Sequence, residues 1–118
     1  MKGTKIKVLY FPVGGDSYIC EIENCLKSMQ ELVKGYIEVF VLDKIYGSHF
    51  SSGALAILNE EGKFTPNIKP NRNVYFGDKL VEKFYGDFFI CGSNNKGVFI
   101  SVTSEQEDYY KKIFTLRA

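Results

Sequence analysis

The chain has 118 residues, of which 45% are hydrophobic and 25% are charged, a balance typical of a globular domain and not of a disordered segment. Its 15 basic and 14 acidic side chains give a formal net charge of +1, which excludes the strong fields of a duplex DNA binder and of an acidic DNA mimic. We therefore expect residues 1–118 to form a single α+β domain, and an aromatic content of 15% favours strand over helix.

The first half of the chain predicts two strands, a helix and a third strand. Lys5 and Lys7 alternate with apolar neighbours, which indicates a half-buried strand, and the Gly14-Gly15 turn suggests that the next strand returns beside it. A helix that starts near residue 17 is the alternative. Asn24 is the predicted N-cap and Gly35 the C-terminal cap of the helix. The expected ranges are strand 4–11, strand 17–22, helix 25–34 and strand 36–42.

The third strand contains one charged residue, Glu38, in an otherwise β-branched or aromatic run. Glu38 shares a face with Tyr36 and Phe40, and it either points to solvent or lines a pocket. Residues 43–53 follow as an irregular polar and aromatic stretch that contains His49, the only histidine. This stretch is either a lid over a site or a surface connection whose aromatics point inward.

The second half predicts further strands and a final helix. Strand 54–58 is expected to turn at 59–62 and continue at 63–65, and 74–76 is a weak strand. Residues 80–85 fit either a helical turn or an extended link. Strand 87–91 should pair with strand 98–102, and Thr103 with Gln106 forms a capping box for a helix over 104–114. The predicted fold is a mostly antiparallel sheet with two helices, in the order β-β-α-β-β-β-β-β-α.

Polar residues gather between the apolar runs of the second half, and they predict a binding site. Asparagine amides both donate and accept hydrogen bonds, and a planar guanidinium suits phosphate or carboxylate. These groups favour a small anionic, nucleotide-like ligand. The ligand-binding residues that we expect are Asn59, Glu60, Asn71, Arg72, Tyr36, Glu38 and His49. Alternatively, the asparagines belong to turns, and Arg72 pairs with Glu38 or Glu61.

No catalytic residue is predicted. Glu60 and Glu61 are adjacent, so they would point to opposite faces of a strand, and Gly14-Gly15-Asp16 lacks the lysine and hydroxyl residue of a phosphate loop. Cys20, Cys25 and Cys91 have neither disulfide nor zinc spacing, so we expect reduced thiols, no metal and no cofactor. No run approaches the roughly 20 apolar residues of a membrane span. With no secretory signal, the expected location is cytoplasmic, without a membrane partner.

Four short motifs in order resemble a small domain family of unknown function found in bacteria, phages and plasmids. They are Gly35-Tyr36-Ile37-Glu38, Asn59-Glu60-Glu61-Gly62-Lys63, Pro70-Asn71-Arg72, and the segment 88–103 followed by an acidic helix. The resemblance covers nearly the whole chain, except that residues 46–52 look like an addition. It implies no activity.

Association of small mobile-element proteins with counter-defence gives the ligand hypothesis a narrower form, in which the protein withholds a host nucleotide signal. The alternative is an interaction module whose exposed sheet edge or loop inhibits a host enzyme. An exposed apolar patch around Tyr46 and Phe50 would favour the module, and a closed polar pocket around Arg72 would favour the ligand. Self-association is a further expectation, because a symmetric interface can enlarge a pocket.

Overall fold

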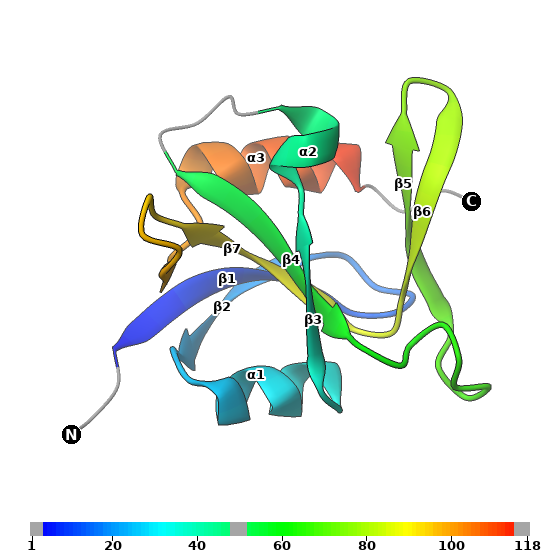
Figure 1. The fold of residues 1–118 in the computed structure, drawn as a ribbon, viewed down its shortest axis with the longest axis horizontal. Helices are drawn as coiled ribbons and strands as arrows, with labels where there is room; N and C mark the ends of the chain where they lie inside the picture. Colours follow the sequence, from blue (N-terminus) through cyan, green and yellow to red (C-terminus); the bar gives the residue numbers. More distant parts are fainter. Residues whose placement is uncertain (1–3, 48–51, 115–118) are drawn as a thin grey trace.

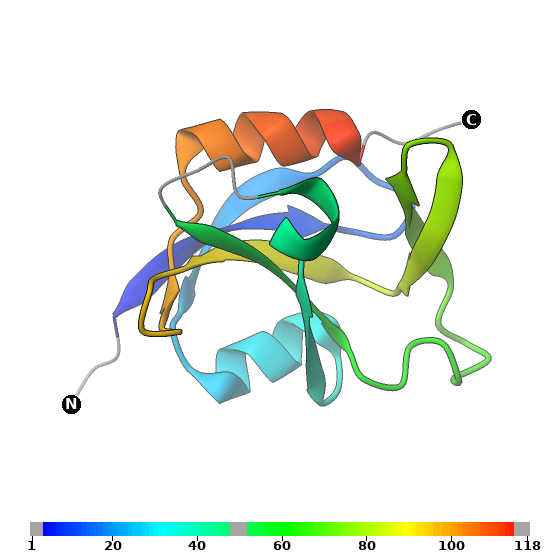
Figure 2. The same cartoon turned by 45° about the horizontal axis from the view of Figure 1, so that its top comes forward.

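The protein forms three layers around an antiparallel sheet (Figures 1 and 2). The computed structural model describes residues 4–47 and 52–114. Helix α1 covers one face of the sheet, and helix α3 lies across the other face. The elements are β1 (Lys5–Phe11), β2 (Tyr18–Glu23), α1 (Leu26–Val33), β3 (Ile37–Val41), α2 (Asp43–Tyr46), β4 (Gly53–Asn59), β5 (Pro70–Phe76), β6 (Lys79–Tyr85), β7 (Phe88–Ser93), β8 (Phe99–Ile100) and α3 (Ser104–Ile113).

The strand order of the main sheet is β2-β1-β7-β4-β3, with β8 added beside β7. Each of these pairings is antiparallel. Strand β7 comes late in the chain and yet lies between β1 and β4, so the centre of the sheet depends on contacts between distant segments. All seven residues of β4 and the first five of β7 are buried or nearly so.

Both faces of the sheet are apolar, because alternate residues of the central strands point to opposite sides. Ile57 and Phe89 face α1, where they pack against Met29 and Val33. Leu58 and Phe88 belong to the cluster on the other face. That second cluster also includes residues of α3 and of the β5–β6 hairpin, namely Tyr110, Phe114, Val74 and Phe84.

The β5–β6 hairpin is a separate two-stranded sheet that stands at one end of the molecule (Figure 1). Phe84 attaches it to the core, with its ring centroid 5.1 Å from that of Phe40 and 5.0 Å from that of Phe88. Asn71 is an extra residue in the ladder, because Pro70 pairs with Tyr85 while Arg72 already pairs with Phe84. Such a β-bulge redirects the side chains beside it, which positions Asn71 and Arg72 toward the main sheet.

The α+β class and the mostly antiparallel sheet are confirmed, as is the Thr103–Gln106 capping box. Three expectations for local structure need correction. Residues 80–85 are extended, as one of the two alternatives predicted, but they form a strand that pairs with β5 instead of a link. Residues 63–65 belong to a series of turns, and residues 43–46 form the one-turn helix α2.

The ends of α1 also differ from the prediction. Cys25 is its N-cap and Lys34 its C-cap, so the helix is one residue shorter than expected at each end. Gly35 is not the capping residue. Leu26, in the first turn, is 56% exposed, and the buried residues of the helix are Met29 and Val33.

Candidate functional site

The predicted ligand-binding residues fall into an exposed group and a group that is buried or half-buried. Tyr36, Glu38 and Glu60 are exposed, and they lie on one face at the end of the β3–β4 ladder, where the Glu60 N–H donates to the Tyr36 carbonyl at 2.8 Å. His49 lies outside the described residues. The remaining three, Asn59, Asn71 and Arg72, are held inside the structure by hydrogen bonds to other residues.

Asn59 closes the C-terminal end of α1. Its amide donates to the carbonyls of Val33 at 3.1 Å and Lys34 at 3.2 Å, while its oxygen accepts from the Glu61 N–H at 2.8 Å. A helix end leaves carbonyls without partners inside the helix, and a buried carbonyl without a partner is destabilising. Gly35 allows the approach, because a Cβ atom there would lie 2.7 Å from the Asn59 amide nitrogen.

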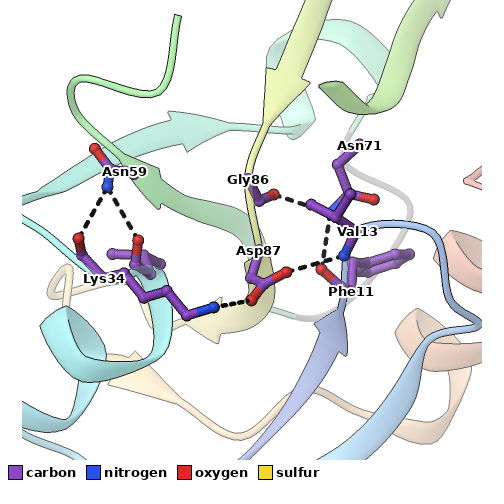
Figure 3. A network of polar contacts seen from close by, with 8 residues as sticks. Phe11, Val13, Lys34, Asn59, Asn71, Gly86 and Asp87 are labelled. Carbon is purple, nitrogen blue, oxygen red and sulfur yellow. Dashed lines mark hydrogen bonds and ion pairs between the residues drawn. The ribbon is translucent and has the colours of Figure 1, made fainter. Parts of the chain in front are cut away.

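Asn71 joins the hairpin to the main sheet. Its amide donates to the carbonyls of Phe11 at 2.8 Å and Gly86 at 2.9 Å, as Figure 3 shows. Its oxygen accepts from the Arg72 guanidinium at 2.5 Å. One side chain therefore connects β1, the turn before β7 and the bulge in β5.

Arg72 is 6% exposed, and its donors are used within the protein. Its Nε donates to the Phe114 carbonyl at 2.6 Å, and Nη2 donates to the Gly15 carbonyl at 2.8 Å. The guanidinium also lies over the Phe11 ring, 5.3 Å from its centroid. Burial lowers the pKa of Arg72, an effect that the nearby Asp16 carboxylate partly offsets. The expected pairing with Glu38 or Glu61 is not among the ion pairs of the described residues.

A pocket of about 260 Å³ lies beside these anchoring bonds, between the end of α1, the turn after β1, the turns before β5 and the turn before β7. We call it the Lys34–Asp87 pocket. Gly86 is suited to its place because its φ is +77° and a Cβ there would lie 2.9 Å from Ile68. The lining residues are Val13, Val33, Lys34, Asn67, Ile68, Lys69, Gly86 and Asp87.

Asp87 organises the charges of the pocket (Figure 3). Its carboxylate accepts from the Val13 N–H at 2.9 Å and from the Lys34 ammonium at 3.1 Å. Burial alone would raise the pKa of Asp87, but hydrogen bonds from Val13, Lys34 and Tyr10 bring that pKa below its ordinary value. Burial, and then the hydrogen bond with Asp87, raise the pKa of Tyr10. The Asp87 carboxylate therefore holds its neighbours in place by accepting their hydrogen bonds.

Lys34 has an unusual backbone. Its φ of 64° and ψ of 39° are left-handed, and no other non-glycine residue of the described chain has a positive φ. This conformation typically costs a non-glycine residue about 1–2 kcal/mol, which is why glycine is the common residue at such helix ends. The Lys34 side chain is 76% exposed, and its ammonium reaches Asp87 at the rim of the pocket.

The sequence did not predict the residues that line the pocket, but it did predict the two asparagines that hold the backbone of the pocket in place. The sequence predicts Lys34 only as the last residue of a helix and Asp87 only as the first residue of a strand. A left-handed lysine just before Gly35 has no reliable sequence signal, because Gly35 itself is the expected cap. The asparagines were conspicuous, and both hold backbone that lines the pocket, Asn59 at Val33 and Lys34 and Asn71 at Gly86.

Among the described residues, neither of the two features expected to separate a ligand binder from an interaction module is seen. Tyr46 packs against the core cluster, and Phe50 lies outside the described residues. Arg72 is surrounded by the carbonyls that it binds and lines none of the pockets described for residues 4–47 and 52–114.

Among the residues that the structure describes, no helix is long and apolar enough to cross a membrane. No three His, Cys, Asp or Glu side chains of these residues gather closely enough to hold a metal ion.

The fold and the pocket together define an α+β domain with two lysines and an aspartate at the rim of a small cavity. The chain belongs to the family described as "Domain of unknown function (DUF3846)", whose model matches residues 6–115. This confirms the resemblance to a family of unknown function, while the distribution among phages and plasmids stays a prediction. Searches of the curated proteins and of the solved structures found no match.

Proposed function

We propose that this protein binds a small anionic ligand, without catalysis, in the Lys34–Asp87 pocket. The observation that carries the proposal is the Lys34 backbone. A residue held in a strained conformation is a reason to look for a function. Here the strained residue brings an ammonium group to the rim of a cavity that Lys69 also lines.

The lining suits a ligand with one charged end and one apolar side. Lys34 and Lys69 would bind a phosphate or carboxylate, and the Asn67 amide would add a donor or an acceptor. Val13, Val33 and Ile68 are the apolar part of the lining. Among the described residues Lys69 belongs to none of the ion pairs, so its charge is available to a ligand.

The cavity volume limits the size of the ligand. Ligand pockets usually measure about 300–1,000 Å³, and this one holds about 260 Å³. The pocket is thus matched to a molecule smaller than a typical drug, or to one part of a nucleotide whose remainder stays outside. Withholding a host nucleotide signal is the narrower form of the proposal, and it rests on the predicted association with mobile elements.

Asn59 and Asn71 support this proposal because their hydrogen bonds fix the walls of the pocket before a ligand arrives. Asn59 holds the carbonyls of Val33 and Lys34, and Asn71 holds the carbonyl of Gly86. A site whose walls are already ordered loses less conformational entropy on binding. Asn59 and Asn71, which were predicted to contact the ligand, would then act mainly by positioning the residues that line the pocket.

The test is an NMR titration of ¹⁵N-labelled protein with inorganic phosphate, acetate and a panel of mononucleotides. We expect the largest amide shifts at Val13, Ile68 and Gly86 for at least one anion. Native mass spectrometry of freshly purified protein would show whether an anion is already bound.

Lys34→Gly separates binding from stability. Glycine relieves the left-handed strain, and the exposed ion pair that is lost contributes only about 0–1 kcal/mol. We therefore expect unchanged or slightly higher stability together with anion affinity at least about tenfold weaker, which corresponds to about 1.4 kcal/mol. The matched control is Lys27→Ala, an exposed lysine on α1 that does not line the pocket. Full anion binding by the Lys34→Gly, Lys69→Ala double variant would refute the proposal.

A further inference from the structure

Strand β3 is an edge strand: within the described part of the chain it pairs with β4 alone, and its outer edge has no ladder partner there. Its register against β4 runs from Ile37 opposite Asn59 to Val41 opposite Leu55. The bonds just beyond the two ends, Glu60 N–H to Tyr36 and Leu42 N–H to Ala54, show that the even-numbered residues of β3 exchange hydrogen bonds with β4. In an antiparallel ladder the alternate residues then point their N–H and C=O groups outward. Those residues are Ile37, Val39 and Val41.

The opposite edge of the same sheet is protected. By the same alternation, the outward backbone groups of β2 belong to Ile19, Glu21 and Glu23, since Asn24 donates to Thr4 in register. Charged residues on an edge strand discourage pairing with another chain. Glu21 and Glu23 also lie opposite Lys7 and Lys5 on β1, so opposite charges face each other across the ladder.

The side chains of β3 differ between its two faces. On the α1 face, Val39 is 44% exposed between neighbours that pack against the core. On the hairpin face, Tyr36 is 70% exposed and lies beside the exposed Glu38 and Glu60. A hollow of about 40 Å³ adjoins this face, with Glu38 and Phe40 among its lining residues.

The acidic groups beside this edge, Glu38 and Glu60, belong to none of the ion pairs of the described residues. Two lysines line the hollow on this face: Lys63 is paired with Glu82, and Lys83 is exposed and belongs to none of these ion pairs. We propose that β3 binds an extended segment of another protein in which apolar and basic residues alternate. The segment adds to the sheet as a strand, with an apolar side chain against Val39 and basic side chains against Glu38 and Glu60.

A second copy of this chain fits the edge less well. A two-fold pairing centred on Val39 would place the two Glu38 side chains diagonally across the new ladder, about 7–8 Å apart at their backbones. Such a pairing adds acidic charge and brings no basic residue of β3, because β3 contains none. Charge complementarity therefore favours a basic partner over self-association.

The experiment uses the full chain and three synthetic hexapeptides. One alternates lysine with valine, a second alternates glutamate with valine, and the third has three lysines followed by three valines. We expect the alternating lysine peptide to slow hydrogen exchange at the amides of Ile37, Val39 and Val41, and to bind more weakly as salt is raised. The other two peptides are expected to bind at least about tenfold more weakly.

Val39→Pro tests the strand pairing itself. The Val39 N–H points away from β4, so proline there removes an outward donor and spares the ladder. We expect this variant to lose peptide binding, whereas Glu21→Pro, which removes an outward donor on the other edge, should keep it. Should Val39→Pro fail to fold, Glu38→Lys is the second variant. We expect it to bind the alternating glutamate peptide more tightly than the alternating lysine peptide.

The inference is independent of the Lys34–Asp87 pocket, because Lys34→Gly should leave peptide binding unchanged. It is overturned by equal binding of the acidic peptide, by protection of the β2 amides in place of those of β3, or by no protection at millimolar peptide. A concentration-dependent dimer in sedimentation that protects Val39 without peptide would assign the edge to a second copy and would also overturn it.

Discussion

Two groups of polar residues lie next to each other at one end of this protein, and they have opposite relations to solvent. Asn59 and Arg72 are buried and Asn71 is half-buried, and all three side chains donate to backbone carbonyls. Lys34 and Asp87 share the wall of an open pocket, where the lysine side chain is 76% exposed. Both groups are joined through Gly86 and the end of α1, as Figure 3 shows.

The difference shows which polar residues are available to a ligand. An acceptor left unsatisfied inside a protein costs about 1–3 kcal/mol, so the buried group cannot exchange its partners for a ligand without weakening the fold. An exposed ion pair contributes about 0–1 kcal/mol, so Lys34 can move from Asp87 to an anion at little cost. The comparison predicts that substitutions in the first group lower the free energy of unfolding by a large amount and that substitutions in the second group lower it by a small amount.

The largest effect is expected from Arg72→Met, which keeps much of the side-chain volume and removes every donor. The carbonyls of Phe114 and Gly15 and the Asn71 oxygen would lose their partner. We expect the free energy of unfolding in urea to fall by about 3–5 kcal/mol, a large part of the ~5–15 kcal/mol typical of a domain. Lys83→Met on exposed β6 is the control. A stable Arg72→Met protein that fails only to bind anions would instead make Arg72 a ligand residue.

A smaller loss, about 1–3 kcal/mol, is expected for Asn59→Ala, because the α1 carbonyls become partly accessible to water once the amide is gone. Gly35→Ala should also destabilise the protein, since its Cβ would crowd the Asn59 amide. The two changes should not be additive, because the three atoms nearest to the added methyl group all belong to the Asn59 side chain, which Asn59→Ala removes. Equal effects of Gly35→Ala in both backgrounds, measured by thermal unfolding, would contradict the close packing of this pair.

Much of the fold could be predicted from the sequence because its signals are local. The apolar runs of β4 and β7 indicate buried strands, and Thr103 with Gln106 specifies the start of α3. The position of β7 between β1 and β4 has no local signal, because it depends on pairing between the two ends of the chain. Strand β6 was missed because its exposed Leu80 and Val81 are consecutive, which breaks the alternation of a half-buried strand.

The candidate site was harder to predict, for a related reason. Residue type identified Asn71 as a polar residue with a specific task, but its partner Phe11 is 60 positions away. A backbone carbonyl and a ligand present the same kind of acceptor to an amide or a guanidinium, so the sequence alone cannot distinguish them. Lys34 and Asp87 are 53 positions apart, and each is an ordinary surface residue by type.

The smallest effect is expected at the pocket, for Asp87→Asn. Hydrogen bonds lower the pKa of Asp87 in the folded state, so its carboxylate stabilises the protein above the unfolded pKa of about 3.9. That contribution is lost as the pH falls through the folded value. Asparagine keeps an acceptor for Val13 but does not titrate, so its stability should depend less on pH between about 5 and 2. Because Lys34 is largely solvated, the difference between the two proteins at pH 7 should stay within about 1 kcal/mol, as thermal unfolding at each pH would measure. A loss as large as that of Arg72→Met would place Asp87 with the residues that hold the fold, and the distinction between the two groups would fail.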